Sequence, residues 1–301
     1  MEQVDCNNCG SAGQETLYEF DLGLSEPAKL VRCTDCGLIY LSPRPGPGEI
    51  GDFYPKNYQE NMLELIARAK KSPAMRLGFD MIRRRRTPKL ISSGRLLDVG
   101  CSNGAYLAAL RERGWEVEGV EMDEHAASYA ANERGLKVTR GDAESALRTL
   151  DSDRFSVVTM WHLLEHLFDP LEALKQVRRV LKPGGVLMLE VPDISAPPAA
   201  WFKKNWFPLD IPRHLYHFSP ETLREMLAKA GLKLVEVKGI PSPEAIVWSM
   251  AARKQGRPID FNRGDSLKMN PLMMAAAFPV SWTMAQFVKS DHIGAAAVRE
   301  S

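Results

Sequence analysis

The sequence predicts an α/β protein in which a doubly wound parallel sheet follows a small module built around cysteines. Two observations predict this fold class. From Arg95 onward, short apolar runs of strand length alternate with amphipathic segments of helix length, which is the pattern of consecutive βαβ units. Ahead of that region, two closely spaced pairs of cysteines lie near the beginning of the chain.

The alternating region contains enough apolar runs for seven strands. Its last expected helix has clear boundaries, because Ser219 can cap it, Pro220 suits its first turn and Gly231 can end it. A further helix is expected over residues 61–86. In the alternating region we expect helices at residues 105–114, 124–135, 170–181 and 220–231, and strands at 95–99, 116–120, 136–140, 155–160, 185–191, 232–237 and 292–298.

The cysteine pairs have the spacing of a metal site. Cys6-x-x-Cys9 and Cys33-x-x-Cys36 form two knuckles, which suit a structural Zn²⁺ held by four thiolates. The first ten residues are polar and carry no secretory signal, so we expect a cytoplasmic protein with reduced thiols. We therefore expect a zinc ribbon over residues 1–45, a linker and helical segment over 46–90, and the sheet domain over 91–301.

The turns after the strands carry the candidate site, because open α/β sheets bind ligands at the carboxyl ends of their strands. Gly100 and Gly104 follow the first strand of the sheet, and small residues there let a ligand approach the backbone. Their spacing differs from the G-x-G-x-x-G signature of dinucleotide sites. Glu121 ends the second strand and can accept hydrogen bonds from two ribose hydroxyls, while Asp142, after the third, can meet an adenine amino group.

Residues 90 to 240 resemble the class I S-adenosylmethionine-dependent methyltransferases. The family's first motif, D/E-x-G-x-G-x-G, appears as Asp98-Val-Gly-Cys-Ser-Asn-Gly104, with Ser102 at the middle glycine, and "VLKPGGVLMLEVPD" resembles the fifth-strand signature. The resemblance implies a Rossmann-like, seven-stranded methyltransferase sheet, with S-adenosyl-L-methionine as the cofactor and Asp98 as an anchor of the turn. It implies a cofactor site that comprises Asp98, Gly100, Cys101, Ser102, Gly104, Glu121, Met122, Asp142, Ala143 and Trp161.

The stretch after the fourth strand admits two interpretations. On a helix, His162-x-x-Glu165-His166 matches the H-x-x-E-H signature of zinc peptidases. It also resembles the L-E-H-x-x-D-P stretch that methyltransferases place beside the methionine end of the cofactor, and the surrounding methyltransferase pattern favours this second interpretation. Some quinone-pathway O-methyltransferases hold a divalent ion with E-x-x-E-H, but this chain has His162 at the first position.

Two histidines are candidate catalytic bases, since a hydroxyl acceptor loses a proton when it is methylated. His166 lies in the stretch just described, and His214 lies in "DIPRHLYHFSP", where the family places substrate contacts. The alternative is that such a histidine only holds the loop, and this is our interpretation of His217. A nearby aromatic group either walls the substrate pocket or belongs to the core: Trp201, Phe202, Trp206 and Phe207.

The acceptor is expected to be a small molecule. A cysteine module followed by this domain, with "CGLIYLSPRP" after the second knuckle, resembles a bacterial family that includes C-methyltransferases of deoxysugar nucleotides. Those enzymes carry Tyr-x-Glu-His where this chain has Ile211-Pro-Arg-His214. We therefore expect methylation of a hydroxyl or a carbon of a nucleotide-linked sugar or a similar metabolite.

Other functions stay open at this stage. An RNA methyltransferase needs a basic face, and the net charge of +1 argues against a nucleic-acid partner. The run Arg83 to Arg86 either contacts phosphates or is a solvated helix end. A catalytically silent scaffold is the second rival, although Glu121 and Asp142 are present.

The uncharged stretch from Met269 to Val288 contains prolines and polar residues that make a spanning helix a poor fit. We expect a buried or surface-lying helix there, which can give residues 270–289 a peripheral membrane contact. The sequence leaves the oligomeric state open.

Overall fold

The computed structural model describes residues 1–54, 91, 93–259 and 271–300. The helix expected at 61–86 and the run Arg83 to Arg86 lie outside the described residues. The chain divides into two compact units. The first unit comprises Met1–Thr87, Pro192–Pro220 and Lys238–Ile293, and the second comprises Pro88–Val191, Glu221–Val237 and Gly294–Ser301.

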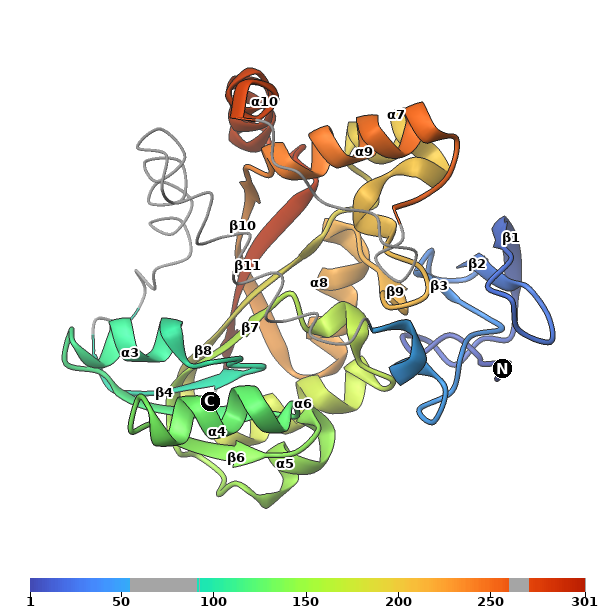
Figure 1. Cartoon of the computed structure of the whole chain (residues 1–301). Coiled ribbons are helices and arrows are strands. Elements are labelled where there is room, and N and C mark those ends of the chain that lie inside the picture. Colours follow the sequence, from blue (N-terminus) through green and yellow to red (C-terminus); the bar gives the residue numbers. More distant parts are fainter. Residues whose placement is uncertain (55–90, 92, 260–270, 301) are drawn as a thin grey trace. The chain divides into compact units, whose positions relative to one another are not determined.

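A seven-stranded sheet confirms the predicted fold class (Figure 1). Its strands are β4 (Arg95–Val99), β5 (Glu116–Glu121), β6 (Lys137–Arg140), β7 (Phe155–Trp161), β8 (Leu181–Pro192), β10 (Leu232–Ile240) and β11 (His292–Arg299). The order is β10-β11-β8-β7-β4-β5-β6, and the five strands from β8 to β6 run parallel. The chain order reverses beside β4, so the ligand crevice of this sheet lies at the carboxyl end of that strand.

Helices alternate with the parallel strands as expected. They are α3 (Ala105–Arg111), α4 (Glu124–Asn132), α5 (Ala143–Thr149), α6 (Pro170–Val180) and α8 (Pro220–Lys229). Asp123, Asp142 and Asp169 cap α4, α5 and α6, each with a carboxylate that accepts a backbone N–H of the first turn. Helix α3 packs on β5, and α4 packs on β5 and β6. The core beneath them includes Leu96, Leu107, Leu110, Trp115, Ala130, Leu136 and Val157.

The first unit contains a second, four-stranded sheet. Its strands, in spatial order, are β1 (Gln14–Phe20), β2 (Ala28–Cys33), β3 (Ile39–Leu41) and β9 (Tyr216–His217). Ile39 pairs with His217 and Tyr40 pairs with Tyr216 in antiparallel register. The loop expected around His214 thus contributes a short strand, β9, to the sheet that carries the cysteines. Buried Arg44 secures it by donating to the hydroxyl of Tyr216 at 3.0 Å.

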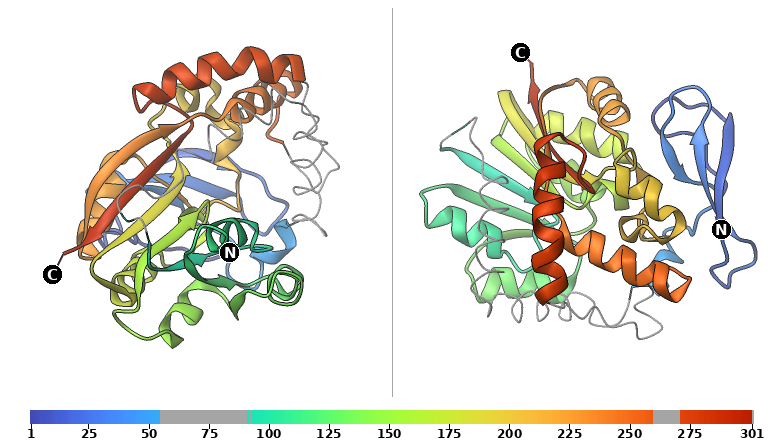
Figure 2. Two further views of the ribbon diagram at one scale, coloured as in Figure 1. Left: turned by 90° about the vertical axis from the view of Figure 1, so that its left-hand side faces the viewer. Right: turned by 90° about the horizontal axis from the view of Figure 1, so that it is seen from above.

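Among its described residues, the first unit also contains several helices. It contains α7 (Pro197–Phe202), α9 (Pro243–Gln255), α10 (Pro271–Gln286) and the short 3₁₀ turns η1 (Ile50–Phe53), η3 (Lys203–Asn205) and η4 (Phe207–Leu209). Helices α9 and α10 pack together (Figure 2), and Trp248 and Met274 are buried between them. Helix α10 occupies the uncharged stretch, where Leu272 is 81% exposed and Phe287, just after the helix, is 70% exposed. No helix among the described residues has both the length and the apolar character that crossing a bilayer requires.

Candidate active site

The turn between β4 and α3 brings the backbone close to the ligand edge of the sheet. Gly100, Ser102 and Gly104 all have positive φ angles, of 80°, 48° and 72°. This region of backbone space favours glycine. A Cβ atom added at Gly104 would clash with the side chain of Leu136 and lie 3.1 Å from the Cβ of Ala130. The glycine is therefore required both by the turn and by the packing of α4 and of Leu136, which directly precedes β6.

Asp98 supports this turn from inside the protein. It is 2% exposed, and the hydroxyl of Thr159 donates to its Oδ1 at 2.6 Å. Burial raises the pKa of Asp98, the Thr159 hydrogen bond lowers it in part, and the negative charge of Glu121 adds a smaller rise, so that the pKa is about 7. Cys101 is also buried, and burial raises the pKa of its thiol.

Glu121 is held in a fixed orientation at the end of β5. Its Oε2 accepts the backbone N–H of Ser102 and its Oε1 accepts that of Asp123, both at 2.8 Å. Each oxygen keeps a further lone pair for a ligand hydroxyl. Met122, the next residue, is 72% exposed, so an apolar side chain stands in solvent beside this carboxylate.

Two further predicted residues follow β6 and end β7. Asp142 caps α5, and its Oδ1 accepts the N–H of Ser145 at 2.8 Å, while Ala143 is buried behind it. Trp161 packs edge-on against Tyr106, with ring centroids 5.7 Å apart. Its indole N–H is buried and has no hydrogen-bond partner among the described residues. These features fit a cofactor that carries adenosine. They are the turn that requires glycine, the oriented carboxylate of Glu121, the exposed side chain of Met122 and the buried N–H of Trp161.

The H-x-x-E-H residues do not share a helical face. His162 precedes η2 (Leu164–His166) and has a positive φ of 53°. Its Nε2 lies 2.9 Å from Oε1 of Glu190, and its Nδ1 lies 3.7 Å from Oε1 of Glu165. Both carboxylates are almost fully buried. The helical arrangement that the peptidase signature needs is therefore absent from this stretch, and His166 lies at the end of the short turn.

The candidate base His214 belongs to the first unit and is only 9% exposed. Its Nδ1 lies 2.8 Å from the carbonyl oxygen of Pro208. A carbonyl only accepts, so Nδ1 carries the proton and Nε2 is the basic nitrogen of the neutral ring. That Nε2 lies 3.7 Å from Oδ2 of Asp210. His217 is more deeply buried and contacts the carbonyl of Leu209 at 3.0 Å, which suits a structural role.

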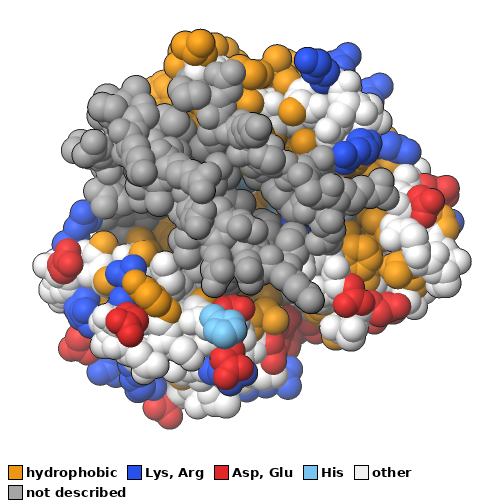
Figure 3. Space-filling view, viewed as in Figure 1, with side chains coloured by type: hydrophobic (Ala, Val, Ile, Leu, Met, Phe, Trp, Pro, Cys, Tyr) orange, Lys and Arg blue, Asp and Glu red, His pale blue; other side chains and the backbone are white. Residues whose placement is uncertain are grey.

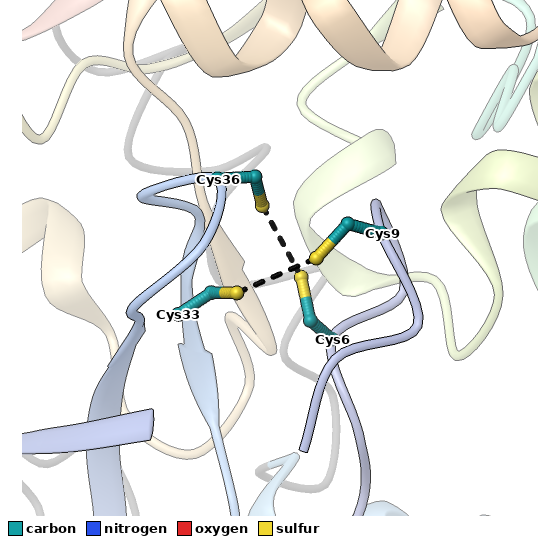
Figure 4. Close-up of side chains that lie close together, drawn as sticks. All are labelled: Cys6, Cys9, Cys33 and Cys36. Atoms are coloured by element: carbon teal, nitrogen blue, oxygen red, sulfur yellow. Dashed lines mark hydrogen bonds between the residues drawn. The ribbon is translucent and has the colours of Figure 1, made fainter. Parts of the chain in front are cut away.

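The four N-terminal cysteines converge on one point (Figure 4). The Sγ atoms of Cys6 and Cys36 are 3.4 Å apart, those of Cys9 and Cys33 are 3.5 Å apart, and all four lie within 4.8 Å of one another. Four thiolates at about 2.3 Å from a tetrahedral Zn²⁺ are about 3.8 Å apart, so the donor set fits this ion. Burial opposes ionisation of Cys33, but hydrogen bonds from backbone N–H groups and from the neighbouring thiols outweigh it and lower the pKa of Cys33 to about 7.

The aromatic residues expected near the substrate, at positions 201–207, differ in their surroundings. Trp206 and Phe207 line a cavity of about 550 Å³ in the first unit, whereas Trp201 is 59% exposed. Asp291, which was not predicted from the sequence, is 1% exposed and accepts the indole N–H of Trp206 at 2.6 Å. Burial raises the pKa of Asp291 to about 7. Its only signal was a charged residue directly before an apolar strand.

This sheet and the glycine turn with its acidic strand ends define the class of S-adenosylmethionine-dependent methyltransferases. Residues 59–237, more than half of the chain, match the model of the methyltransferase domain family, and the chain belongs to that family. It is therefore an enzyme that uses S-adenosylmethionine as its methyl donor.

Relatives of known activity agree with this membership. A ubiquinone biosynthesis O-methyltransferase of Cereibacter sphaeroides is 29% identical over 170 residues, which are 53% of this chain and 68% of that protein. A ubiquinone biosynthesis O-methyltransferase of Coxiella burnetii is 29% identical over 154 residues, which are 48% of this chain and 66% of that protein.

The fold is shared with the [4+2]-cyclase SpnF, at a TM-score of 0.53 and 21% identity, over 85% of this chain and 97% of that one. It is also shared with a SAM-dependent methyltransferase from Archaeoglobus fulgidus, at a TM-score of 0.50 and 21% identity, over 74% and 93%.

Proposed function

We propose that this enzyme methylates a hydroxyl or a carbon of a small-molecule acceptor, a nucleotide-linked sugar or a similar metabolite. The proposal has two parts, methyl transfer and the identity of the acceptor. The observation that supports methyl transfer is the oriented carboxylate of Glu121 beside the glycine turn. The relatives are named as O-methyltransferases, which favours a hydroxyl as the accepting group. Methylation of a ubiquinone precursor is the competing acceptor chemistry.

The cofactor site comprises the ends of three neighbouring strands. Glu121 binds the ribose hydroxyls, and Asp142 meets the adenine amino group with the oxygen that the α5 cap leaves available. Met122 and Ala143 contact the base, while the turn from Asp98 through Gly104 lets the cofactor lie against the backbone. Trp161 donates its buried N–H to the cofactor. When bound, S-adenosylmethionine supplies an electrophilic methyl group for in-line displacement.

His214 is the proposed general base, and His166 is the second candidate. Support for His214 comes from its tautomer, because the Pro208 carbonyl leaves Nε2 as the basic nitrogen. Asp210 lies near enough to stabilise the ring once it has gained the proton of the acceptor hydroxyl.

The four cysteines hold one structural Zn²⁺ in this proposal. The ion stabilises the sheet of β1, β2, β3 and β9, to which the segment that carries His214 contributes β9. The predicted domain boundaries at residues 45 and 90 remain part of this proposal.

Surface charge supports a small-molecule acceptor over RNA. On the face drawn in Figure 3, Lys and Arg side chains gather at the upper right and alternate with Asp and Glu side chains at the lower left, and the net charge of the whole chain is only +1. The exposed apolar residues of α10 support a peripheral membrane contact.

Release of S-adenosylhomocysteine tests the reaction. We expect turnover with nucleotide sugars in an acceptor screen, and His214→Asn should lower it at least ~100-fold with unchanged affinity for S-adenosylmethionine. His217→Gln, which keeps a donor for the Leu209 carbonyl, is the matched control and should retain turnover. Turnover with quinone precursors alone would contradict the acceptor class, and near-normal turnover of His214→Asn would exclude it as the base.

A further inference from the structure

The cavity in the first unit lies beside the proposed base, because Asp210, the neighbour of His214, is one of its lining residues. Its volume is about 550 Å³, within the range of about 300–1,000 Å³ that small ligands occupy. Four segments far apart in the sequence line it: the end of β1 with the two residues after it, η1, the stretch from η3 to Arg213, and the residues after α9. The cavity therefore forms only when the first unit is folded.

Aromatic side chains wall this cavity and are fixed in advance. Trp206 is 1% exposed, and its N–H donates to Asp291 at 2.6 Å. The backbone N–H of Phe207 donates to Ser249 at 2.9 Å, and its ring packs against that of Trp248 with centroids 4.7 Å apart. Walls that are ordered before binding lower the entropic cost of binding a ligand.

The cations of the cavity are already engaged. Lys204 donates to the carbonyl of Glu19 at 3.2 Å and lies over the ring of Phe20, 5.8 Å from its centroid. Arg213 donates to Asp210 through Nε at 3.2 Å and Nη2 at 2.5 Å. Arg257 donates to the carbonyl of Pro258 at 3.1 Å.

Among the described residues of the lining, carboxylates outnumber these cations. The acidic residues are Glu19, Asp21, Asp52 and Asp210, against three basic residues. Binding a phosphate or diphosphate requires cations or N–H donors that can turn to it, and the surplus here is negative. The cavity therefore suits an uncharged ligand.

We infer that this cavity binds an uncharged, polyhydroxylated ring, the glycosyl unit of the methyl acceptor. The C–H faces of such a ring lie against the negative faces of aromatic rings, here Phe20 and Phe207. Its hydroxyls donate to carboxylates such as Asp21 and exchange hydrogen bonds with the amide of Asn205. The assignment of this ring to the acceptor rests on the proposed function, whereas the binding itself does not.

Saturation-transfer NMR on the full chain tests the binding without turnover. The probes are methyl α-D-glucopyranoside, methyl α-D-mannopyranoside and methyl α-L-rhamnopyranoside at millimolar concentration, with sodium pyrophosphate and catechol as competitors. We expect transfer to at least one glycoside, unaffected by pyrophosphate and by catechol. Phe20→Ala and Asn205→Ala should abolish it. Phe287→Ala is the matched control, because Phe287 is exposed and does not line the cavity.

Four results would overturn the inference: no transfer to any of the three glycosides, displacement by pyrophosphate, displacement by catechol, or full transfer in both cavity variants. The reaction assay separates this inference from the proposed function. Glycoside binding that depends on Phe20 without S-adenosylhomocysteine release from any sugar acceptor would support the cavity and contradict the proposed acceptor. Release of S-adenosylhomocysteine from nucleotide sugars that persists in Phe20→Ala and Asn205→Ala would support the proposed acceptor and contradict the role of the cavity.

Discussion

Replacing Gly104 by alanine tests whether the glycine turn is dictated by packing as well as by backbone conformation. Gly104 has a φ of 72°, and an added Cβ would clash with Leu136. The end of the Leu136 side chain can shift, but the Cβ of Ala130 at 3.1 Å belongs to α4 and cannot move alone. The left-handed conformation costs alanine about 1–2 kcal/mol, and overpacking adds about 1–3 kcal/mol.

The chain offers a matched control at the other end of α3. Gly114 has a φ of 87°, and nothing lies within 4 Å of an added Cβ. Gly114→Ala therefore carries the backbone cost alone, reduced in both variants by about 0.4–1 kcal/mol because alanine restricts the unfolded chain. We expect Gly104→Ala to lower the free energy of unfolding by about 1–3 kcal/mol more than Gly114→Ala does.

Denaturant unfolding of the two variants measures this difference, and titration with S-adenosylmethionine gives a second readout. Gly104→Ala should also bind the cofactor more weakly, because relief of the clash displaces the turn, whereas Gly114→Ala should bind normally. Equal losses of stability together with equal affinities would refute the packing argument.

Three further predictions concern the metal, the buried acid and α10. Cys9→Ser should lower the zinc content from one ion per chain, as measured by elemental analysis, whereas Cys101→Ser should retain it; equal zinc in both would contradict the site. The pKa of Asp98 is raised from 3.8 to about 7 in the folded protein, so the folded state binds this proton more tightly and stability falls as pH rises through that window. Asp98→Asn should flatten this fall in denaturant unfolding across the window, and an unchanged slope would contradict it. Leu272→Asp combined with Phe287→Asp should reduce flotation with anionic vesicles, and equal flotation would exclude the membrane contact.

The sheet could be predicted because its signal is local. Each parallel strand is an apolar run, and the turn from Gly100 to Gly104 can be recognised from its glycines and small residues. Glu121 and Asp142 could be placed because strand ends of a parallel sheet share one edge. His162 was harder, because a run of helix-forming residues concealed a left-handed residue held by Glu190.

The first unit shows why the rest could not be predicted. The two residues of β9 pair with Ile39 and Tyr40 across more than 170 positions, and no local pattern encodes such a partner. The cavity likewise assembles residues from Glu19 to Ile259. Asp291 takes its role from Trp206, 85 positions away, so its burial became visible only in the fold.

Calorimetric titration with S-adenosylmethionine tests the central claim most directly, with wild type and Glu121→Gln compared. We expect one cofactor per wild-type chain at micromolar affinity. Loss of the charged acceptor at residue 121 should weaken binding by about 1.5–3 kcal/mol, about 10-fold to 150-fold. Absence of binding to the wild type, or equal affinity in Glu121→Gln, would contradict the assignment of this turn as the cofactor site.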